Sequence, residues 1–273
     1  MWPIAVMINS GALLRRRARR SLMLALLSAS AASPVPAAEA IVRTSFFEPF
    51  NRIDTRRWYI SDGWVNGAQQ GCTWSRKQLA IRGGILQLRV AQAPNRLRSH
   101  ECAEIRTHAR YGYGLYEVRL RSAAGAGLNT AMFTYSGKPL TPVHDEIDFE
   151  FLGKSPRTVQ LNYFVAGKGG HETLTPVGAD ASTDFHDYAF DWGPQQIRWY
   201  IDGKLVRTAA SPPLPAVPGQ FFLSLWMGAA PVDAWLGKFV DTRPVIDAEV
   251  DWVAYTAPGE RCAFAQSVSC KPQ

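Results

Sequence analysis

Short runs of alternating apolar and polar residues, separated by Gly, Pro, Asp and Asn, recur along residues 39–273. A two-residue period is typical of β-strands, because successive side chains point to opposite faces of a sheet. The runs rich in Val, Ile, Tyr, Phe and Trp are 84–90, 114–120, 158–164, 187–192, 196–201, 221–226 and 248–255. Asp202-Gly203 directly follows 196–201 and predicts a tight hairpin. No long amphipathic helix pattern interrupts these runs, so the sequence predicts an all-β fold, an antiparallel β-sandwich.

The run 144–152 carries an acid at every second position. The acids are Glu146, Asp148 and Glu150, and the large apolar residues that alternate with them are Ile147, Phe149 and Phe151. A strand here would place three carboxyl groups on one face. Such a row is unfavourable, because like charges on one face repel and acidic residues are depleted from strands. No Lys or Arg lies between His144 and Glu150 to neutralise it.

Two interpretations fit this row. For an isolated alternation, the ordinary interpretation is a solvated outer face of a sheet. The neighbouring aromatic-rich strands and the lack of a neutralising base favour catalysis instead. Glycoside hydrolysis needs two carboxyl groups flanking the scissile bond, one ionised and one protonated. Glu146 and Glu150 suit these roles, and Asp148 between them would help decide which neighbour keeps a proton.

Residues 1–38 are predicted to be an export segment. Arginines at 15, 16, 17, 19 and 20 precede an apolar run at 22–27 and small residues with candidate cleavage sites at 35–37 and 38–40. A transmembrane anchor is the alternative, but the run is shorter than the roughly 20 residues that a span needs. We therefore expect a signal peptide over 1–38, one domain over 39–273, secretion or periplasmic localisation, and no membrane association after cleavage.

The export segment also changes the interpretation of charge. The chain has 30 basic and 23 acidic residues, a net charge of +7, and residues 1–38 hold five Arg and no acid. The remainder carries 25 basic against 23 acidic residues, which removes the main argument for nucleic-acid binding. Gly-rich phosphate loops are absent, so no cofactor is expected for catalysis.

The chain has four cysteines, Cys72, Cys102, Cys262 and Cys270. In an exported chain they favour disulfides, and no Cys-x-x-Cys spacing suggests a metal site. Three pairings are open. Cys262 and Cys270 are near neighbours in a tail with little else to hold it, and Cys72 with Cys102 would then close a loop of about 30 residues.

Several motifs resemble one family of enzymes. Besides 146–150 they are Cys-Ala-Glu-Ile-Arg at 102–106, Tyr-Gly-Tyr-Gly-Leu-Tyr-Glu-Val at 111–118, Tyr-Ala-Phe-Asp-Trp at 188–192 and Asp-Trp-Val at 251–253. Together they cover about 45–256 and resemble glycoside hydrolase family 16, in particular the lichenase-type endo-1,3-1,4-β-glucanases. The segments 142–144 and 259–266 are similar to the branch that depolymerises succinoglycan, an acidic bacterial exopolysaccharide.

The resemblance implies a concanavalin-like jelly roll with a concave substrate cleft and an endo-acting enzyme that retains anomeric configuration. It makes Glu146 the nucleophile, Glu150 the acid/base residue and Asp148 an auxiliary acid. The positions that match the lining of a lichenase cleft are Trp64, Asn66, Glu104, Arg106, Asn162, Trp226 and Trp235. For each Trp, packing in the sandwich core is the alternative. Glu104 and Arg106, two residues apart, are expected to form a buried ion pair, whose alternative role is to fix the cleft wall.

Two further features follow from the resemblance. It supports the pairing of Cys72 with Cys102. It also implies a structural calcium ion, held by the backbone oxygens of Pro49 and Gly84 and by Asp251, in keeping with the preference of calcium for oxygen ligands.

Three positions depart from the lichenase pattern. Lichenases carry an aromatic residue at His144, an aromatic hydroxyl at Phe164 and an amide at Ser224. These differences argue against ordinary mixed-linkage glucan and are compatible with a branched, acidic polymer. His144 is expected to contact substrate or to have a structural role. The predicted partner is a polysaccharide bound by a monomer, and the alternatives are a lectin-like binding protein or a transglycosylase on the same fold.

Overall fold

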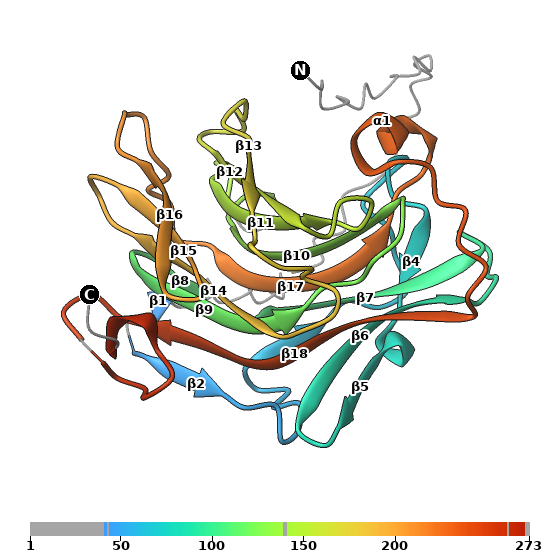
Figure 1. The fold of residues 1–273 in the computed structure, drawn as a ribbon, viewed down its shortest axis with the longest axis horizontal. Helices are drawn as coiled ribbons and strands as arrows, with labels where there is room; N and C mark the ends of the chain where they lie inside the picture. The colour runs from blue at the N-terminus through green and yellow to red at the C-terminus, as the bar shows by residue number, and fades with distance from the viewer. Residues whose placement is uncertain (1–40, 43, 139–140, 261, 271–273) are drawn as a thin grey trace, which may run out of the picture. The chain divides into compact units, whose positions relative to one another are not determined.

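The front layer of the fold is a curved sheet that contains the acidic run (Figure 1). The computed structural model describes residues 41–42, 44–138, 141–260 and 262–270, so the predicted export segment, 1–38, lies outside the described residues. In order, the strands of this front sheet are β13 (Thr173–Pro176), β12 (Thr158–Phe164), β11 (Glu146–Leu152), β10 (Leu128–Tyr135), β17 (Gln220–Met227), β7 (His100–Thr107) and β3 (Trp58–Ile60). Neighbouring strands in it are antiparallel.

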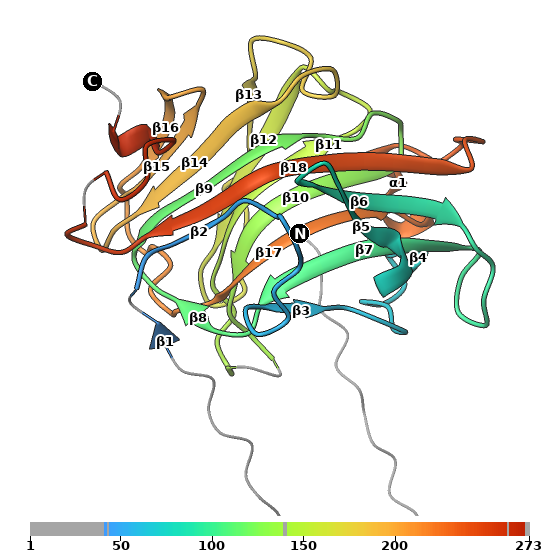
Figure 2. The same cartoon turned by 90° about the horizontal axis from the view of Figure 1, so that it is seen from below.

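A second sheet, the back sheet, packs against the first and lies below it in the middle of Figure 1. Its path is β6 (Ile85–Gln92), β18 (Val245–Thr256), β9 (Gly114–Arg121), β14 (His186–Trp192), β15 (Ile197–Ile201) and β16 (Lys204–Ala209). Figure 2 shows β18 running between β6 and β9, with β2 (Phe46–Glu48) also beside it. The remaining strands are β1 (Ile41–Val42), β4 (Cys72–Trp74), β5 (Leu79–Arg82) and β8 (Arg110–Tyr111). Short pairing of β6 with β7 joins the two sheets.

Alternation along each strand produces the core between the sheets. The apolar side chains of β11, Ile147, Phe149 and Phe151, are at most 2% exposed and point inward. Phe149 packs on Tyr188 and Phe190 of β14, and Phe151 meets Tyr188 edge to face with ring centroids 4.6 Å apart. The strands of both layers bend in the same direction, so the other face of the front sheet, which carries the acids, is concave (Figure 1).

The predicted strands agree with the observed ones, and so does the predicted all-β class. Asp202 and Gly203 form the turn between β15 and β16, and both have positive φ, 49° and 78°. This is the backbone conformation that a two-residue hairpin needs, which explains why Asp-Gly is found there. Helix is limited in the described ranges to α1 (Asp233–Leu236) and the 3-10 turns Arg76–Gln78, Ala230–Val232 and Val268–Cys270.

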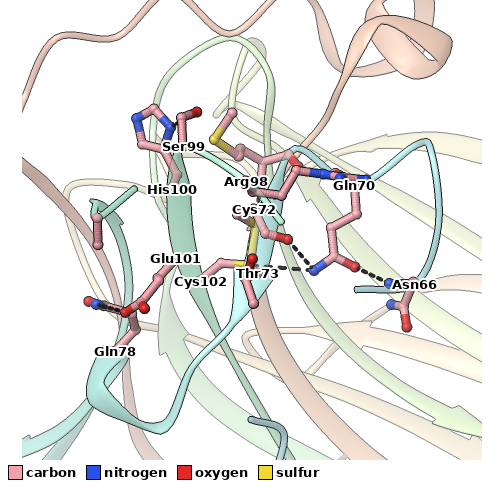
Figure 3. The surroundings of a disulfide bond; sticks show 12 residues. Asn66, Gln70, Cys72, Thr73, Gln78, Arg98, Ser99, His100, Glu101 and Cys102 are labelled. Atoms are coloured by element: carbon pink, nitrogen blue, oxygen red, sulfur yellow. Dashed lines mark hydrogen bonds between the residues drawn. A yellow bond between two sulfur atoms is a disulfide. The ribbon is translucent and has the colours of Figure 1, made fainter. Parts of the chain in front are cut away.

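Both expected disulfides are present. Cys72 of β4 is bonded to Cys102 of β7, and Cys262 to Cys270 in the C-terminal tail. The first is fully buried. In Figure 3 the Gln70 side chain lies beside it, donating through Nε2 to the Cys72 carbonyl oxygen, and Gln70 Oε1 accepts from the Asn66 backbone N–H.

Removal of the buried disulfide should destabilise the fold. We expect the double substitution Cys72→Ala, Cys102→Ala to lower the free energy of unfolding by about 3 to 4 kcal/mol, because the bond closes a loop of about 30 residues. Cys262→Ala with Cys270→Ala is the matched control and should cost about 2.5 kcal/mol or less, since its loop is much shorter. Urea unfolding measures both. Equal stability of wild type and the first variant would contradict the prediction.

Candidate active site

The three acids of β11 lie side by side on the concave face of the front sheet. The pairing register places Glu146 between Tyr135 and Phe164, Asp148 between Phe133 and Asn162, and Glu150 between Ala131 and Gln160. Each acid therefore has its own neighbours on β10 and β12. The consequence is that three identical functional groups sit in three different environments.

Glu150 is held by neutral amides. Its carboxyl oxygens accept hydrogen bonds from Asn129 Nδ2 at 3.2 Å and from Gln160 Nε2 at 2.7 Å. Gln160 Oε1 in turn accepts from Trp235 Nε1 at 3.1 Å. Burial and the charge of Glu146 raise the pKa of Glu150 to about 8, against the lowering effect of the two amides. Glu150 therefore keeps its proton at neutral pH and is suited to act as an acid.

Asp148 is the most deeply buried acid of the row, with 2% of its surface exposed. Burial, followed by the charges of Glu146 and Glu150, raises its pKa well above the usual value. Asp148 Oδ2 and the facing Asn162 Oδ1 are both buried and have no hydrogen-bond partner within the described part of the chain. The middle of the row thus offers two buried polar atoms to a bound molecule.

Among the described residues, Glu146 is the acid of the row that contacts a basic side chain. His144 Nε2 lies 2.5 Å from Glu146 Oε2. The imidazole stacks on Phe164 with ring centroids 5.1 Å apart, and it also contacts Tyr135 at 4.9 Å. No Lys or Arg side chain in the described ranges comes within 4.0 Å of any of the three acids.

Cross-strand pairing gathers several of the other predicted residues on this face. Asn162 is the partner of Asp148 on β12, and Trp226 is the partner of Asn129, which binds Glu150. Trp235 of α1 packs on Trp226 with ring centroids 6.1 Å apart. These aromatic and amide groups therefore surround the Glu150 end of the row.

Glu104 and Arg106 also share this face, but the expected ion pair between them is wrong. Glu104 accepts a hydrogen bond from Ser61 Oγ at 2.5 Å, and Arg106 donates to Gln220 Oε1 and lies over the Tyr59 ring. Burial raises the pKa of Glu104 to about 7, although the hydrogen bond from Ser61 and the charge of Arg106 act in the opposite direction. Each side chain thus has another partner, Ser61 directly after β3 for Glu104 and Gln220 of β17 for Arg106.

Comparison with known proteins shows to which family this chain belongs. The family model for glycosyl hydrolases family 16 matches residues 66–253. The chain belongs to glycosyl hydrolases family 16. An endo-1,3-1,4-β-glycanase, ExoK, from Rhizobium meliloti is 45% identical over 83% of this chain and 84% of its own length. A β-glucanase from Bacillus amyloliquefaciens is 41% identical over 77% of this chain and 87% of its own length.

Solved structures agree with this assignment. A β-1,3-1,4-glucanase (lichenase) derived from a mouse hindgut metagenome has a TM-score of 0.75 and 40% identity, and the match covers 78% of this chain and 99% of that one. The Bacillus licheniformis β-glucanase has a TM-score of 0.73 and 41% identity, covering 78% and 97%. The family 16 jelly roll predicted from the motifs is therefore confirmed.

Trp64 and Asn66 lie outside the strand register, on the loop before β4. Trp64 is 37% exposed and rests against buried Trp74. The loop pairs with the end of β17 through Gln70 and Gly228, which places it beside the Trp226 end of the concave face. The described contacts do not join Trp64 or Asn66 to the acids, so their substrate roles stay predictions.

Several neighbours of the acids were not predicted from the sequence. They are Asn129, Phe133, Tyr135, Gln160 and Phe222, of which Phe133 and Phe222 stack with ring centroids 4.6 Å apart. These residues come near the acids through the pairing register of neighbouring strands, and the sequence of β11 alone does not give that register.

The calcium ligands expected for family 16 are brought together in the back sheet. β2 and β6 pair with β18 on either side of Asp251, so Pro49 after β2 and Gly84 before β6 reach the same stretch. The oxygen donors suit calcium in kind. Asp251 Oδ2 is, however, 3.3 Å from Arg119 Nε. No cluster of three or more His, Cys, Asp or Glu ligands occurs among the residues described.

The calcium prediction can be tested by thermal unfolding with calcium and with EDTA. A site filled at a hundredfold excess over its Kd adds about 2.7 kcal/mol, or about 5 to 10 °C in Tm for a chain of this size. The Tm of Asp251→Asn should be the same with calcium and with EDTA. An unchanged wild-type Tm would show that the Arg119 pairing leaves no calcium site.

The acids also predict how stability depends on pH. The folded pKa of Glu150, about 8, lies above its usual 4.5, so unfolding releases a proton within this interval and stability falls as pH rises through it. Each such group contributes up to about 1.4 kcal/mol per pH unit. Glu150→Gln should weaken this fall, while Asp148 and Glu104 retain part of it. Urea unfolding at pH 5 and pH 8 would contradict the prediction if both proteins had the same pH slope.

Proposed function

We propose that the chain is an endo-acting, retaining β-glycanase. The observation that carries the proposal is the difference between the two outer acids of one row. Glu146 is paired with a basic imidazole, whereas Glu150 is held by neutral amides and has a pKa raised to about 8. Glycosidases need one ionised and one protonated carboxyl group, and retention follows where the ionised one, here proposed to be Glu146, acts as nucleophile.

In the proposed first step, Glu146 attacks the anomeric carbon while Glu150 donates its proton to the departing glycosidic oxygen. A covalent bond between Glu146 and the sugar forms, and the glycosidic bond breaks. In the second step Glu150, now ionised, removes a proton from water, which displaces Glu146 with a second inversion. Asp148 and Asn162 each have a buried oxygen with no partner among the described residues, and we propose that they bind a sugar hydroxyl beside Glu146.

The concave face beyond the acids suits a polymer. Sugar rings present apolar faces rimmed by hydroxyl groups, which aromatic rings and amides complement. The Trp226–Trp235 pair stands next to Gln160 at one end of the row, and the Phe133–Phe222 stack lies beside Asp148. A concave face lined by rings and amides along its strands suits a run of several sugar units, which supports endo action.

We further propose that the natural substrate is a bacterial exopolysaccharide such as succinoglycan. The relative from Rhizobium meliloti is a 1,3-1,4-β-glycanase at 45% identity, and segments 142–144 and 259–266 resemble that branch. Lys138 and Lys168 are exposed on the connections that flank His144, where they suit an acidic substituent.

Export is also part of the proposal. The two disulfides are typical of chains that fold outside the reducing cytoplasm. Within the described residues no helix combines the length and hydropathy that crossing a bilayer requires. The segment 1–38 is proposed as the signal peptide, with 39–273 as the mature single domain.

The function can be tested by release of reducing sugar from mixed-linkage β-glucan and from succinoglycan. We expect wild type to cleave at least one polymer and Glu146→Gln to lose at least about 10³-fold in kcat, because it removes the nucleophile. Glu249→Gln, on the back sheet, is the matched control and should stay active. NMR of the first product should show the β-anomer.

Each contrary result has a distinct meaning. An active Glu146→Gln would remove the nucleophile assignment. Initial release of the α-anomer would replace retention by inversion. Polymer binding without cleavage by any variant would favour the lectin-like alternative, and transfer to added sugar in place of hydrolysis would favour a transglycosylase.

A further inference from the structure

His144 is part of the acid row in space although it is not an acid. It directly precedes β11, and its Nε2 atom lies 2.5 Å from Glu146 Oε2. The contact joins a ring nitrogen to a carboxyl oxygen, the kind of pair that forms charge-assisted hydrogen bonds. It is also partly shielded from water, since the side chains of His144 and Glu146 are 24% and 18% exposed.

The imidazole is fixed independently of the carboxylate. One ring face stacks on Phe164 at the end of β12, with an angle of 19° between planes, and Tyr135 at the end of β10 packs near it. The His144 carbonyl oxygen accepts a hydrogen bond from the Gly167 backbone N–H at 2.7 Å. Two ring contacts and one backbone hydrogen bond therefore hold His144 where it meets Glu146.

The acidic groups around the row determine what the contact between His144 and Glu146 can do. The groups around the pair are Tyr135 on β10 and Asp148 and Glu150 on β11, which are acids or a phenol. Glu172 before β13, also an acid, acts on Asp148 and Glu150. Lys168 lies on the turn that holds the His144 carbonyl group, with an exposed side chain. Crowded carboxyl groups cannot all ionise, and a hydrogen bond donated to one of them favours its ionised form.

We propose that His144 is a positioning residue that keeps Glu146 ionised and aimed for attack. It donates Nε2–H to the carboxylate that becomes the nucleophile, and thereby selects which acid of the row carries the charge. This inference rests on the proposed function. It differs from the expectation of a substrate contact, because His144 acts here through Glu146.

The proposal is tested by two variants that separate the hydrogen bond from the ring. His144→Phe keeps an aromatic ring on Phe164 but removes the donor, and His144→Gln keeps a donor that cannot be charged. We expect kcat to fall on the order of 10²-fold in His144→Phe, as for a misplaced reacting group, with KM little changed. His144→Gln should recover part of kcat, and the acidic limb of its kcat/KM profile should move to higher pH.

A second His–carboxylate pair provides the matched control. His186 Nδ1 lies 2.8 Å from Asp202 Oδ2 in the back sheet, away from the row, so His186→Gln should leave kcat and the pH profile unchanged. Circular dichroism melting checks that each variant is folded. Unchanged kcat in His144→Phe, or a raised KM with normal kcat, would overturn the positioning role.

One measurement is independent of activity. In ¹⁵N-labelled wild type, the His144 Nε2–H proton should be protected from exchange with water, and Glu146→Ala should abolish the protection. The same exchange rate in both proteins would refute the pair itself. Absence of hydrolysis by wild type would instead refute the proposed function, so the two failures are distinguishable.

Discussion

The buried face of β11 is the constraint on which the rest of the site depends. Ile147, Phe149 and Phe151 fill the core, and because side chains alternate along a strand, this burial forces the acids onto the concave face. A slip of one residue would place three carboxyl groups in the core and three large apolar groups in the cleft. Packing against β14, on the opposite face of the sheet from the acids, therefore helps to hold this register.

Once the acids are fixed, their neighbours decide how they differ. Amides from β10 and β12 hold Glu150, burial acts on Asp148, and an imidazole from the preceding residues meets Glu146. Burying the two acids costs folding free energy, because the charged form is unfavourable there. The same burial raises the pKa of Glu150, so that this residue can donate a proton at neutral pH. Stability and reactivity thus oppose each other along a single strand.

Much of the fold and the centre of the site could be predicted from the sequence, because both depend on the two-residue alternation of apolar and polar residues within single strands. β10, at Leu128–Tyr135, was not identified, since it is buried on both faces and shows little alternation. The amides that bind Glu150 were missed because they depend on register between distant strands. The pairing of Glu104 with Arg106 was wrong for a related reason. Residues two apart on a strand are separated by about 6.6 Å along it, and cross-strand partners such as Ser61 were nearer.

The loop that carries Trp64 and Asn66 is held in place differently from the strands. Its backbone is tied by side chains, since Arg98 donates to the carbonyl oxygens of Gly67 and Gln70, and Gln70 joins the loop to the Cys72–Cys102 disulfide (Figure 3). Such ties can change without altering the strand register. In this fold the strand register therefore fixes the acids of β11, whereas side-chain hydrogen bonds fix the loop at the rim of the same face.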